Sequence, residues 1–170
     1  DRWSLLDITC HGTANPDIDL AAAKASFTMA AGDDVDCTYT DVKVPTATVQ
    51  IVKVADPADG TQFRFFAGGG KGGVEPADTS FILAPDGAIA SRTLTVHPAA
   101  GGEQFFFGEL VPNDWNLTDI KCLDDGTPLG NAGMSGVDVT VNPGDTITCT
   151  FTNVKDATLT VVKEAPDDPA

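Results

Sequence analysis

The sequence is short of basic residues, and no long hydrophobic run occurs in it. Lys and Arg together number 10 against 25 acidic residues, so the formal net charge is −15. This sign argues against a nucleic-acid partner, because a phosphate backbone attracts positively charged surfaces. No apolar run approaches the roughly 18 residues of a membrane-spanning helix. We therefore expect neither nucleic-acid binding nor membrane insertion.

Glutamate and aromatic residues are also scarce. The acidic residues comprise 21 Asp and 4 Glu, and aromatic residues make up 7% of the chain. Asp is unfavourable inside helices and common in turns, and the 17 Gly and 11 Pro have the same preference. The composition therefore favours short strands joined by many turns.

The four cysteines contain no close pair of the kind that binds zinc. Cys10 and Cys37 are 27 positions apart, and so are Cys122 and Cys149. The equal gaps predict one disulfide that occurs twice, Cys10–Cys37 and Cys122–Cys149, and disulfides indicate an oxidising, extracellular setting. The alternative is four buried free thiols in a cytosolic protein.

The equal spacing belongs to a longer internal repeat. Residues 3–43 align without a gap to residues 115–155 at an offset of 112, with 14 of 41 positions identical. Residues 47–53 (ATVQIVK) then match 157–163 (ATLTVVK) at an offset of 110. The repeat predicts tandem domains. Residues 1–43 are the C-terminal half of one repeat, 44–156 are a complete repeat, and 157–170 are the first strand of the next. The partial repeats are completed elsewhere in a longer array or by another chain.

The complete repeat has the pattern of an all-β, antiparallel β-sandwich. Only Asp19–Lys24 has some helical character, and Ala67–Gly73 is predicted to be a loop. The predicted strands are Thr48–Val54, Gln62–Phe66, Thr79–Leu83, Arg92–Val96, Gln104–Leu110, Trp115–Cys122, Val137–Val141 and Thr146–Val154.

Three polar residues of these strands fall on an apolar face. Side chains alternate between the two faces of a strand, so Asn153 shares a face with Phe151. By the same count Lys53 lies with Ile51, and Glu109 lies with Phe107. A lone buried Lys, Glu or Asn is costly unless it is paired. We therefore expect the three to meet in the interior, where they either react with one another or stay a buried, hydrogen-bonded ion pair with an amide. The remaining alternative is that they are strand ends that reach water.

An apolar site that holds these three groups has a defined chemistry. Burial lowers a lysine pKa and raises a glutamate pKa, so the amine can be neutral and the acid protonated. The neutral amine of Lys53 can attack the carboxamide of Asn153 while Glu109 transfers protons, and ammonia leaves. The product is an amide between two side chains, formed once and without turnover.

Three stretches carry a resemblance to a known family: VQIVK (residues 49–53), FFFGELVPNDWNLT (105–118) and CTFTN (149–153). They resemble the SpaA/CnaB-type prealbumin-like (Ig-like) domains, which are tandem modules of bacterial surface proteins, pilins and adhesins. The resemblance implies an intramolecular isopeptide bond between Lys53 and Asn153 with Glu109 as its catalyst. The family usually has Thr-Glu where this chain has Gly108-Glu109.

The partial repeats carry further candidates of the same kind. Asp41 takes the Asn position of the leading repeat, and Lys163 begins the strand after the complete repeat, so the partners of both lie outside their own fragments. Trp3 and Trp115 are expected to be packing anchors.

The resemblance implies an extracellular structural protein of the cell surface, a stalk, fibre or filament, and not an enzyme. Its partners would be neighbouring repeats of the same protein, with strand exchange between copies as a second arrangement. The objection to such exchange is that the partial repeat lacks more than one strand. Two different functions also stay open: an adhesin module that binds a protein or glycan through its loops, and an accessory domain of a secreted enzyme.

The remaining motifs are weaker. Gly68–Gly73 lacks the order of a phosphate-binding loop. Asp56–Gly60 and Asp124–Gly126 have only part of a calcium-ligand set, and His11 and His97 lie at unrelated places in the repeat. We expect no metal and no cofactor.

Overall fold

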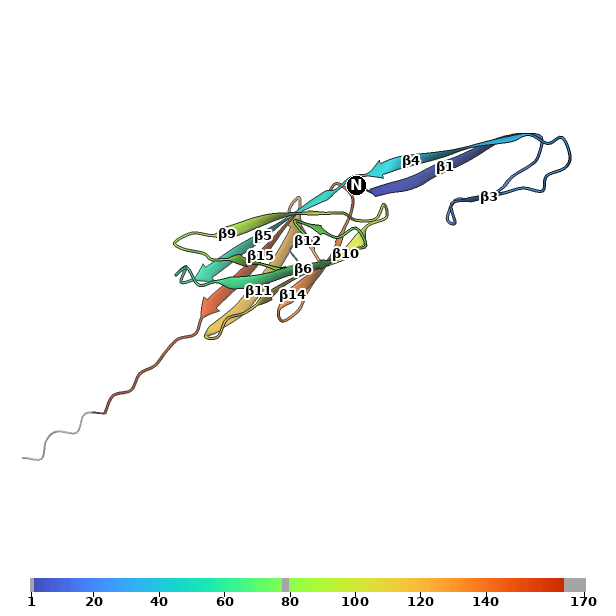
Figure 1. The fold of residues 1–170 in the computed structure, drawn as a ribbon. Helices are drawn as coiled ribbons and strands as arrows, with labels where there is room; N and C mark the ends of the chain where they lie inside the picture. Colours follow the sequence, from blue (N-terminus) through green and yellow to red (C-terminus); the bar gives the residue numbers. More distant parts are fainter. Residues whose placement is uncertain (1, 78–79, 164–170) are drawn as a thin grey trace, which may run out of the picture.

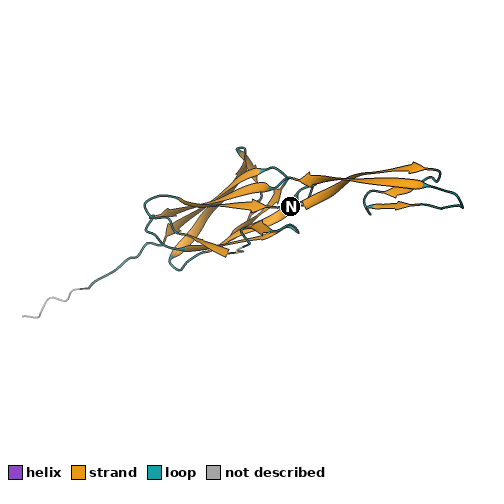
Figure 2. Cartoon of the chain, turned by 45° about the horizontal axis from the view of Figure 1, so that its top comes forward, coloured by secondary structure: helices purple, strands orange, loops and turns teal. Residues whose placement is uncertain are grey.

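The computed structural model describes residues 2–77 and 80–163, and within these ranges the chain consists of strands, turns and loops (Figure 2). None of these residues forms a helix long and apolar enough to cross a membrane. The all-β prediction is confirmed. The fold has three parts along its length: a leading hairpin, a β-sandwich and an extended tail (Figure 1).

The sandwich is built from two sheets that pack face to face. The five-stranded sheet has the order β13-β14-β10-β6-β8, and the six-stranded sheet has the order β12-β11-β15-β5-β9-β7. The strands of the first sheet are β6 (Phe63–Gly69), β8 (Ser80–Leu83), β10 (Glu103–Leu110), β13 (Asn131–Ala132) and β14 (Gly136–Val141). Those of the second are β5 (Ala47–Asp56), β7 (Val74–Glu75), β9 (Ala90–Val96), β11 (Trp115–Asp124), β12 (Thr127–Leu129) and β15 (Thr146–Lys155).

The core lies between the two sheets and follows the alternation of the strands. In β15, Ile147, Cys149 and Phe151 are fully buried, whereas the residues between them are partly exposed. Phe65 of the opposite sheet packs edge-on against Phe151, with ring centroids 5.1 Å apart. One strand face thus fills the interior, as period-two patterning requires.

The pairing of β5 with β15 corrects the antiparallel prediction in one respect. These two strands, the first and the last of the complete repeat, run parallel, with Lys53 opposite Phe151, while the other strand pairs of the sandwich are antiparallel. A parallel pair needs a long crossover connection. Here the strands between β5 and β15 form that connection. The parallel pairing therefore joins the two ends of the repeat, and the pattern of neighbouring segments in the sequence does not predict it.

The leading hairpin pairs β1 (Arg2–Gly12) with β4 (Val35–Val44), and the small hairpin of β2 (Asp17–Asp19) and β3 (Lys24–Ser26) lies within its loop. β1 and β4 repeat the pairing of β11 and β15 position by position. Leu5 lies opposite Asp41 as Leu117 lies opposite Asn153, and both pairs have an irregularity directly after the leucine. The internal repeat is therefore structural as well as sequential.

The hairpin is joined to the sandwich at one end. Arg2 Nη1 donates to the His97 carbonyl and to Glu103 Oε2, both at 3.0 Å. Only Pro45 and Thr46 separate β4 from β5, and the tail leaves the sandwich at its opposite end (Figure 1). The three parts consequently follow one another in a line.

Three local predictions differ from the structure. Strand β6 continues to Gly69, so only the second part of Ala67–Gly73 is a loop. Asp19–Lys24 is a turn between β2 and β3, without a helix. Residues 157–163 form no strand; a strand needs a hydrogen-bonded neighbour, and none lies beside them within the described ranges. Thr79, predicted to begin a strand, lies outside the described residues, as do residues 164–170.

Candidate functional site: a buried lysine, glutamate and asparagine

Lys53 lies wholly inside the sandwich. Along β5 the inward positions are Val49, Ile51, Lys53 and Ala55, and the lysine is 0% exposed. The strand alternation forces this placement, because Val49 and Ile51 on the same face are core residues. A lysine this deeply buried has lost its hydration and depends on its neighbours for hydrogen bonds.

Asn153 and Glu109 approach Lys53 from two directions. Asn153 follows Phe151 on the inward face of β15 and is 0% exposed. Glu109, 3% exposed, follows Phe107 on β10, which belongs to the opposite sheet. The structure thus brings the three predicted side chains together, with the two sheets contributing to one site.

The contacts form a short chain from amine to amide to acid. Lys53 Nζ donates to Asn153 Oδ1 at 2.5 Å and to the Val54 carbonyl at 3.0 Å. Asn153 Nδ2 donates to Glu109 Oε1 at 2.6 Å. The other carboxyl oxygen, Oε2, lies 3.5 Å from Lys53 Nζ and accepts no hydrogen bond from the described residues. Glu109 therefore presents one oxygen to each of the two nitrogens.

Burial shifts both titratable groups toward their neutral forms. Desolvation lowers the pKa of the Lys53 ammonium from 10.5 to about 8, although the charge of Glu109 opposes this shift. Desolvation likewise raises the pKa of Glu109, against the opposing influence of Lys53 and Asn153. Both shifts reduce the free energy of moving a proton from the amine to the carboxylate.

Aromatic rings cover one side of the site. Their position beside Lys53 was not predicted from the sequence. The Nζ of Lys53 lies 4.2 Å from the centroid of the Phe63 ring, and Phe63 packs edge-on against Trp115 at 5.1 Å. Lys155 Nζ lies 5.6 Å from the Trp115 ring and is paired with Asp59 at 2.8 Å. Trp115 is 6% exposed and is a packing anchor, as predicted.

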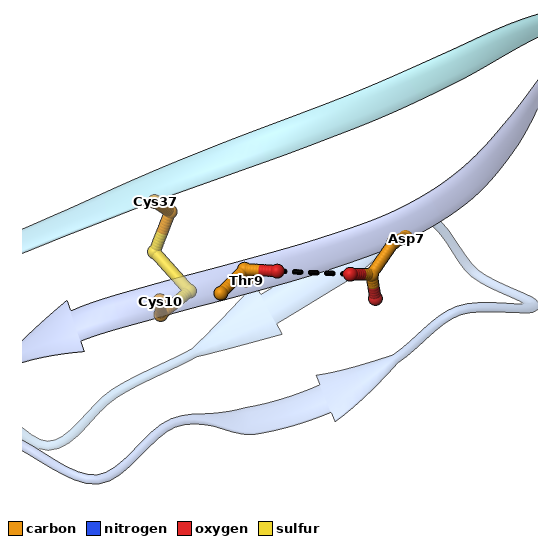
Figure 3. Close-up of a disulfide and its surroundings, with 4 residues drawn as sticks. All are labelled: Asp7, Thr9, Cys10 and Cys37. Carbon is orange, nitrogen blue, oxygen red and sulfur yellow. Dashed lines mark hydrogen bonds between the residues drawn. A yellow bond between two sulfur atoms is a disulfide. The ribbon is translucent and has the colours of Figure 1, made fainter.

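Both predicted disulfides are present. Cys122–Cys149 joins β11 to β15 within the core, and Cys10–Cys37 joins β1 to β4 in the hairpin. Each bond links residues directly opposite in register. Figure 3 shows the hairpin disulfide beside Thr9, whose hydroxyl donates to Asp7 Oδ2 at 2.8 Å.

The candidates of the partial repeats lie on the surface. Asp41 of β4 and Lys163 of the tail are both exposed. Trp3, predicted to be a packing anchor like Trp115, is 64% exposed. No second sheet of the described residues packs over Trp3, whereas the Phe63 ring of the opposite sheet covers Trp115.

The remaining motifs contribute no further site. In residues 2–77 and 80–163, no group of three or more His, Cys, Asp or Glu side chains is arranged to hold a metal ion. Asp59 of the calcium-like stretch is instead bound to Lys155, and its Oδ1 accepts from the Thr61 hydroxyl at 2.6 Å. Gly70 and Gly73 close a turn in the glycine-rich loop, where the Gly73 amide donates to the Gly70 carbonyl at 3.3 Å.

Comparison with family profiles gives two matches of one kind. A SpaA-type profile, described as a prealbumin-like fold domain, matches residues 49–155, and a second SpaA-type profile with the same description matches residues 7–43. The chain belongs to the SpaA-type prealbumin-like domain family. The two matches follow the internal repeat, one on the complete repeat and one on the leading partial repeat.

Among solved structures, the chain is similar to an asparagine-to-alanine mutant of the major pilin from Streptococcus pyogenes. The two share 11% sequence identity with a TM-score of 0.39, over 91% of this chain and 65% of the pilin. The chain thus spans about 65% of the length of that pilin chain. No curated protein matches the sequence.

Proposed function

We propose that this chain is a structural segment of an extracellular stalk or fibre at a cell surface, whose complete repeat locks itself with an amide bond between Lys53 and Asn153. The observation that carries the proposal is the buried Lys53–Asn153–Glu109 cluster, in which the amine and the carboxamide already touch. Membership of the SpaA-type family supports the structural role.

The proposed reaction uses only the three side chains. Lys53 Nζ, as the neutral amine, attacks Asn153 Cγ and forms a C–N bond. Glu109 accepts the proton that the attacking nitrogen loses and delivers a proton to Nδ2, which leaves as ammonia. Amine plus carboxamide thus become a secondary amide plus ammonia, and Glu109 ends the reaction unchanged. The domain reacts with itself once, so it does not act as an enzyme with turnover.

The arrangement of β5 and β15 gives the bond a mechanical role. Tension in a linear array enters at Ala47, where β5 begins, and leaves at Lys155, where β15 ends. Because the two strands are parallel neighbours, this load shears the ladder between them. An amide from Lys53 to Asn153 would carry the load directly from one strand to the other. The rest of the core and the Cys122–Cys149 disulfide would then be shielded.

The surface charge fits the same role. A net charge of −15 on 170 residues keeps neighbouring fibres apart and soluble. The partners in this proposal are neighbouring repeats of the same protein, arranged end to end.

The intact mass of the reduced protein tests the lock. We expect the mass to be lower than that of the sequence by one ammonia, and we expect Glu109→Gln and Lys53→Met variants to keep the full mass. The Gln variant retains the size and hydrogen-bonding capacity of Glu109 but cannot transfer protons. A wild-type protein of full mass would exclude the amide bond.

An adhesin role is the second candidate, because two aromatic side chains point outward. Phe66 and Phe106 are each 41% exposed on the outer face of the five-stranded sheet, and together with Leu110 they line a shallow hollow. Binding of a host protein or glycan that is lost in a Phe66→Ser/Phe106→Ser variant of unchanged thermal stability would support this function. The same ligand bound equally well by the variant would argue against this surface.

A further inference from the structure

The outer face of the five-stranded sheet carries a patch of apolar side chains that are each at least 41% exposed: Phe66, Ile82, Phe106 and Leu110. The register makes them neighbours, because Phe66 lies opposite Gly108, which stands between Phe106 and Leu110 on β10. Exposed apolar side chains that adjoin one another mark a surface where a ligand or partner binds. All of these residues belong to the complete repeat.

Two glycines shape the surface around Phe106. Gly108 and Gly136 lie opposite each other on β10 and β14. A Cβ at Gly108 would lie 2.7 Å from Cε1 of the Phe106 ring, and a Cβ at Gly136 would lie 2.5 Å from its Cζ. The ring therefore occupies the space above both glycines and lies along the sheet. Glycine within a strand is typical of a place that a ligand approaches closely.

Two hollows adjoin these rings and share a wall made by Leu110 and Val111. One hollow, of about 360 Å³, lies beside the two exposed phenyl rings. The other, of about 460 Å³, is also lined by Gln62, Arg64 and Asn113. Volumes of this size fall in the range of roughly 300–1,000 Å³ that is usual for small-molecule sites.

The polar side chains of the larger hollow are available to a ligand. Arg64 is the only basic residue in the described strands of the five-stranded sheet, although the chain as a whole carries a net charge of −15. None of the described residues forms a hydrogen bond or an ion pair with the side chains of Gln62, Arg64 or Asn113. A guanidinium binds a carboxylate through two parallel hydrogen bonds, and the two carboxamides offer donors and acceptors to hydroxyl groups.

Asp138 limits the charge that the patch accepts. It is exposed and lies opposite Phe106 on β14, whereas Arg64 lies opposite Leu110 on the other side of β10. The two charges thus stand at diagonally opposite corners of the patch. A ligand with one carboxylate at Arg64 fits this arrangement, and a second carboxylate near Asp138 is repelled.

The backbone of this face is closed to a further strand. Both β6 and β10 have a neighbour on each side, so neither can pair with an extended peptide. Recognition therefore depends on two phenyl rings, one guanidinium and two carboxamides. These groups suit a sugar, whose apolar C–H face packs on an aromatic ring while its hydroxyl groups bond to amides.

We propose that the outer face of the five-stranded sheet binds an acidic saccharide, with the carboxylate of the sugar on Arg64 and its C–H face on Phe66 and Phe106. Sialic acids and uronic acids share this chemistry. The proposal names the ligand class for the adhesin role, the second candidate above, and rests on that role. It does not involve the buried lysine, glutamate and asparagine.

NMR titration of the isotope-labelled chain tests the proposal with two matched pairs of probes. Sialyllactose is compared with lactose, and methyl glucuronide is compared with methyl glucoside. We expect an acidic probe to shift the amide signals of Arg64, Phe66 and Phe106 and to bind more tightly than its neutral counterpart. The pair that shows this difference identifies the source of the carboxylate.

Substitutions assign the contacts. Arg64→Gln is expected to weaken the acidic probe about threefold, as the loss of an exposed ion pair does, and to leave the neutral probe unchanged. Phe66→Ser/Phe106→Ser is expected to weaken both probes of the pair. The matched control, Lys121→Gln, removes a positive charge from an exposed position of β11 in the other sheet and is expected to bind like the wild type. If the double variant is less stable, Arg64→Gln decides the test.

Four results would overturn the proposal: no shift at these residues with either acidic probe, equal binding of the acidic and neutral probes in both pairs, equal effects of Arg64→Gln and Lys121→Gln, or tighter binding of the acidic peptide acetyl-Leu-Asp-Leu-amide than of either acidic sugar. A host ligand that is lost in the double phenylalanine variant but unaffected by Arg64→Gln would keep the adhesin role and exclude the acidic saccharide. The intact mass of the same samples reports separately on the amide lock.

Discussion

Asp41 and Asn153 occupy the same register position of two strands that are 112 residues apart in sequence. Asp41 lies opposite Leu5 and Asn153 lies opposite Leu117, yet the first is exposed and the second is fully buried. The difference comes from what packs against each strand and not from the strand itself. In the part of the chain that the structure describes, the complete repeat has a second sheet, which removes Asn153 from water and brings it to an amine and an acid, and the leading hairpin does not.

The leading repeat has an aspartate where the complete repeat has Asn153, and this difference leads to a prediction about the Asn153→Asp variant. If Lys53 forms an amide with the new carboxyl group, water leaves instead of ammonia, and the product is chemically identical to that of the wild type. We therefore expect the two mature proteins to have the same intact mass, although their sequences differ. A mass for the variant that equals its unreacted sequence would show that Lys53 does not react with an acid at this site. Adding Glu109→Gln to either protein gives the unreacted reference.

The two disulfides are predicted to differ in their effect on the sandwich. Replacing Cys122 and Cys149 by Ala removes a cross-link inside the core, and we expect the free energy of unfolding to fall by about 2–4 kcal/mol. Replacing Cys10 and Cys37 by Ala serves as the matched control, since that pair has the same separation but lies in the hairpin. Its removal leaves the unfolding midpoint of the sandwich unchanged. If both double variants lowered the midpoint of chemical denaturation equally, the hairpin disulfide would also stabilise the sandwich, and this prediction would be wrong.

The strand positions and the inward placement of Lys53, Glu109 and Asn153 could be predicted because they depend on local alternation. Each residue lies two positions from a large apolar residue, and period-two geometry assigns both to one face. The two disulfides could also be predicted, because the internal repeat gives both pairs of cysteines the same separation.

Other features depend on contacts between distant segments, and the sequence could not reveal them. Phe63 contacts the amine of Lys53, but in the sequence it cannot be told apart from Phe65 of the same strand. The parallel pairing of β5 with β15 joins the two ends of the repeat. Trp3 has the sequence context of the buried Trp115 and is nevertheless exposed, because burial depends on a facing sheet and not on the residue.

Asp59 is predicted to titrate well below a free aspartate. Its hydrogen bond from Lys155 comes first among the causes that lower its pKa to about 2, followed by the bond from Thr61. A lowered carboxyl pKa stabilises the folded state above the unfolded value near 3.8, and this contribution is lost as the pH falls through about 2. NMR titration of the Asp59 carboxyl carbon checks the midpoint. In Lys155→Met the midpoint moves up toward 3.8, and an unchanged midpoint would mean that Lys155 is not the cause.

Gly136 is predicted to be intolerant of a side chain because it lies against the paired strand. A Cβ at this position would lie 2.5 Å from the Phe106 ring and 2.8 Å from the Phe107 carbonyl oxygen, and the carbonyl belongs to the paired strand and cannot move aside. We expect Gly136→Ala to destabilise the sandwich by about 1–3 kcal/mol in chemical denaturation, as overpacking does. Gly101→Ala is the control, because nothing lies within 4 Å of its Cβ position. A Gly136→Ala protein as stable as Gly101→Ala would show that strands β10 and β14 can separate locally, and the hollow beside Phe106 would then be able to widen for a ligand.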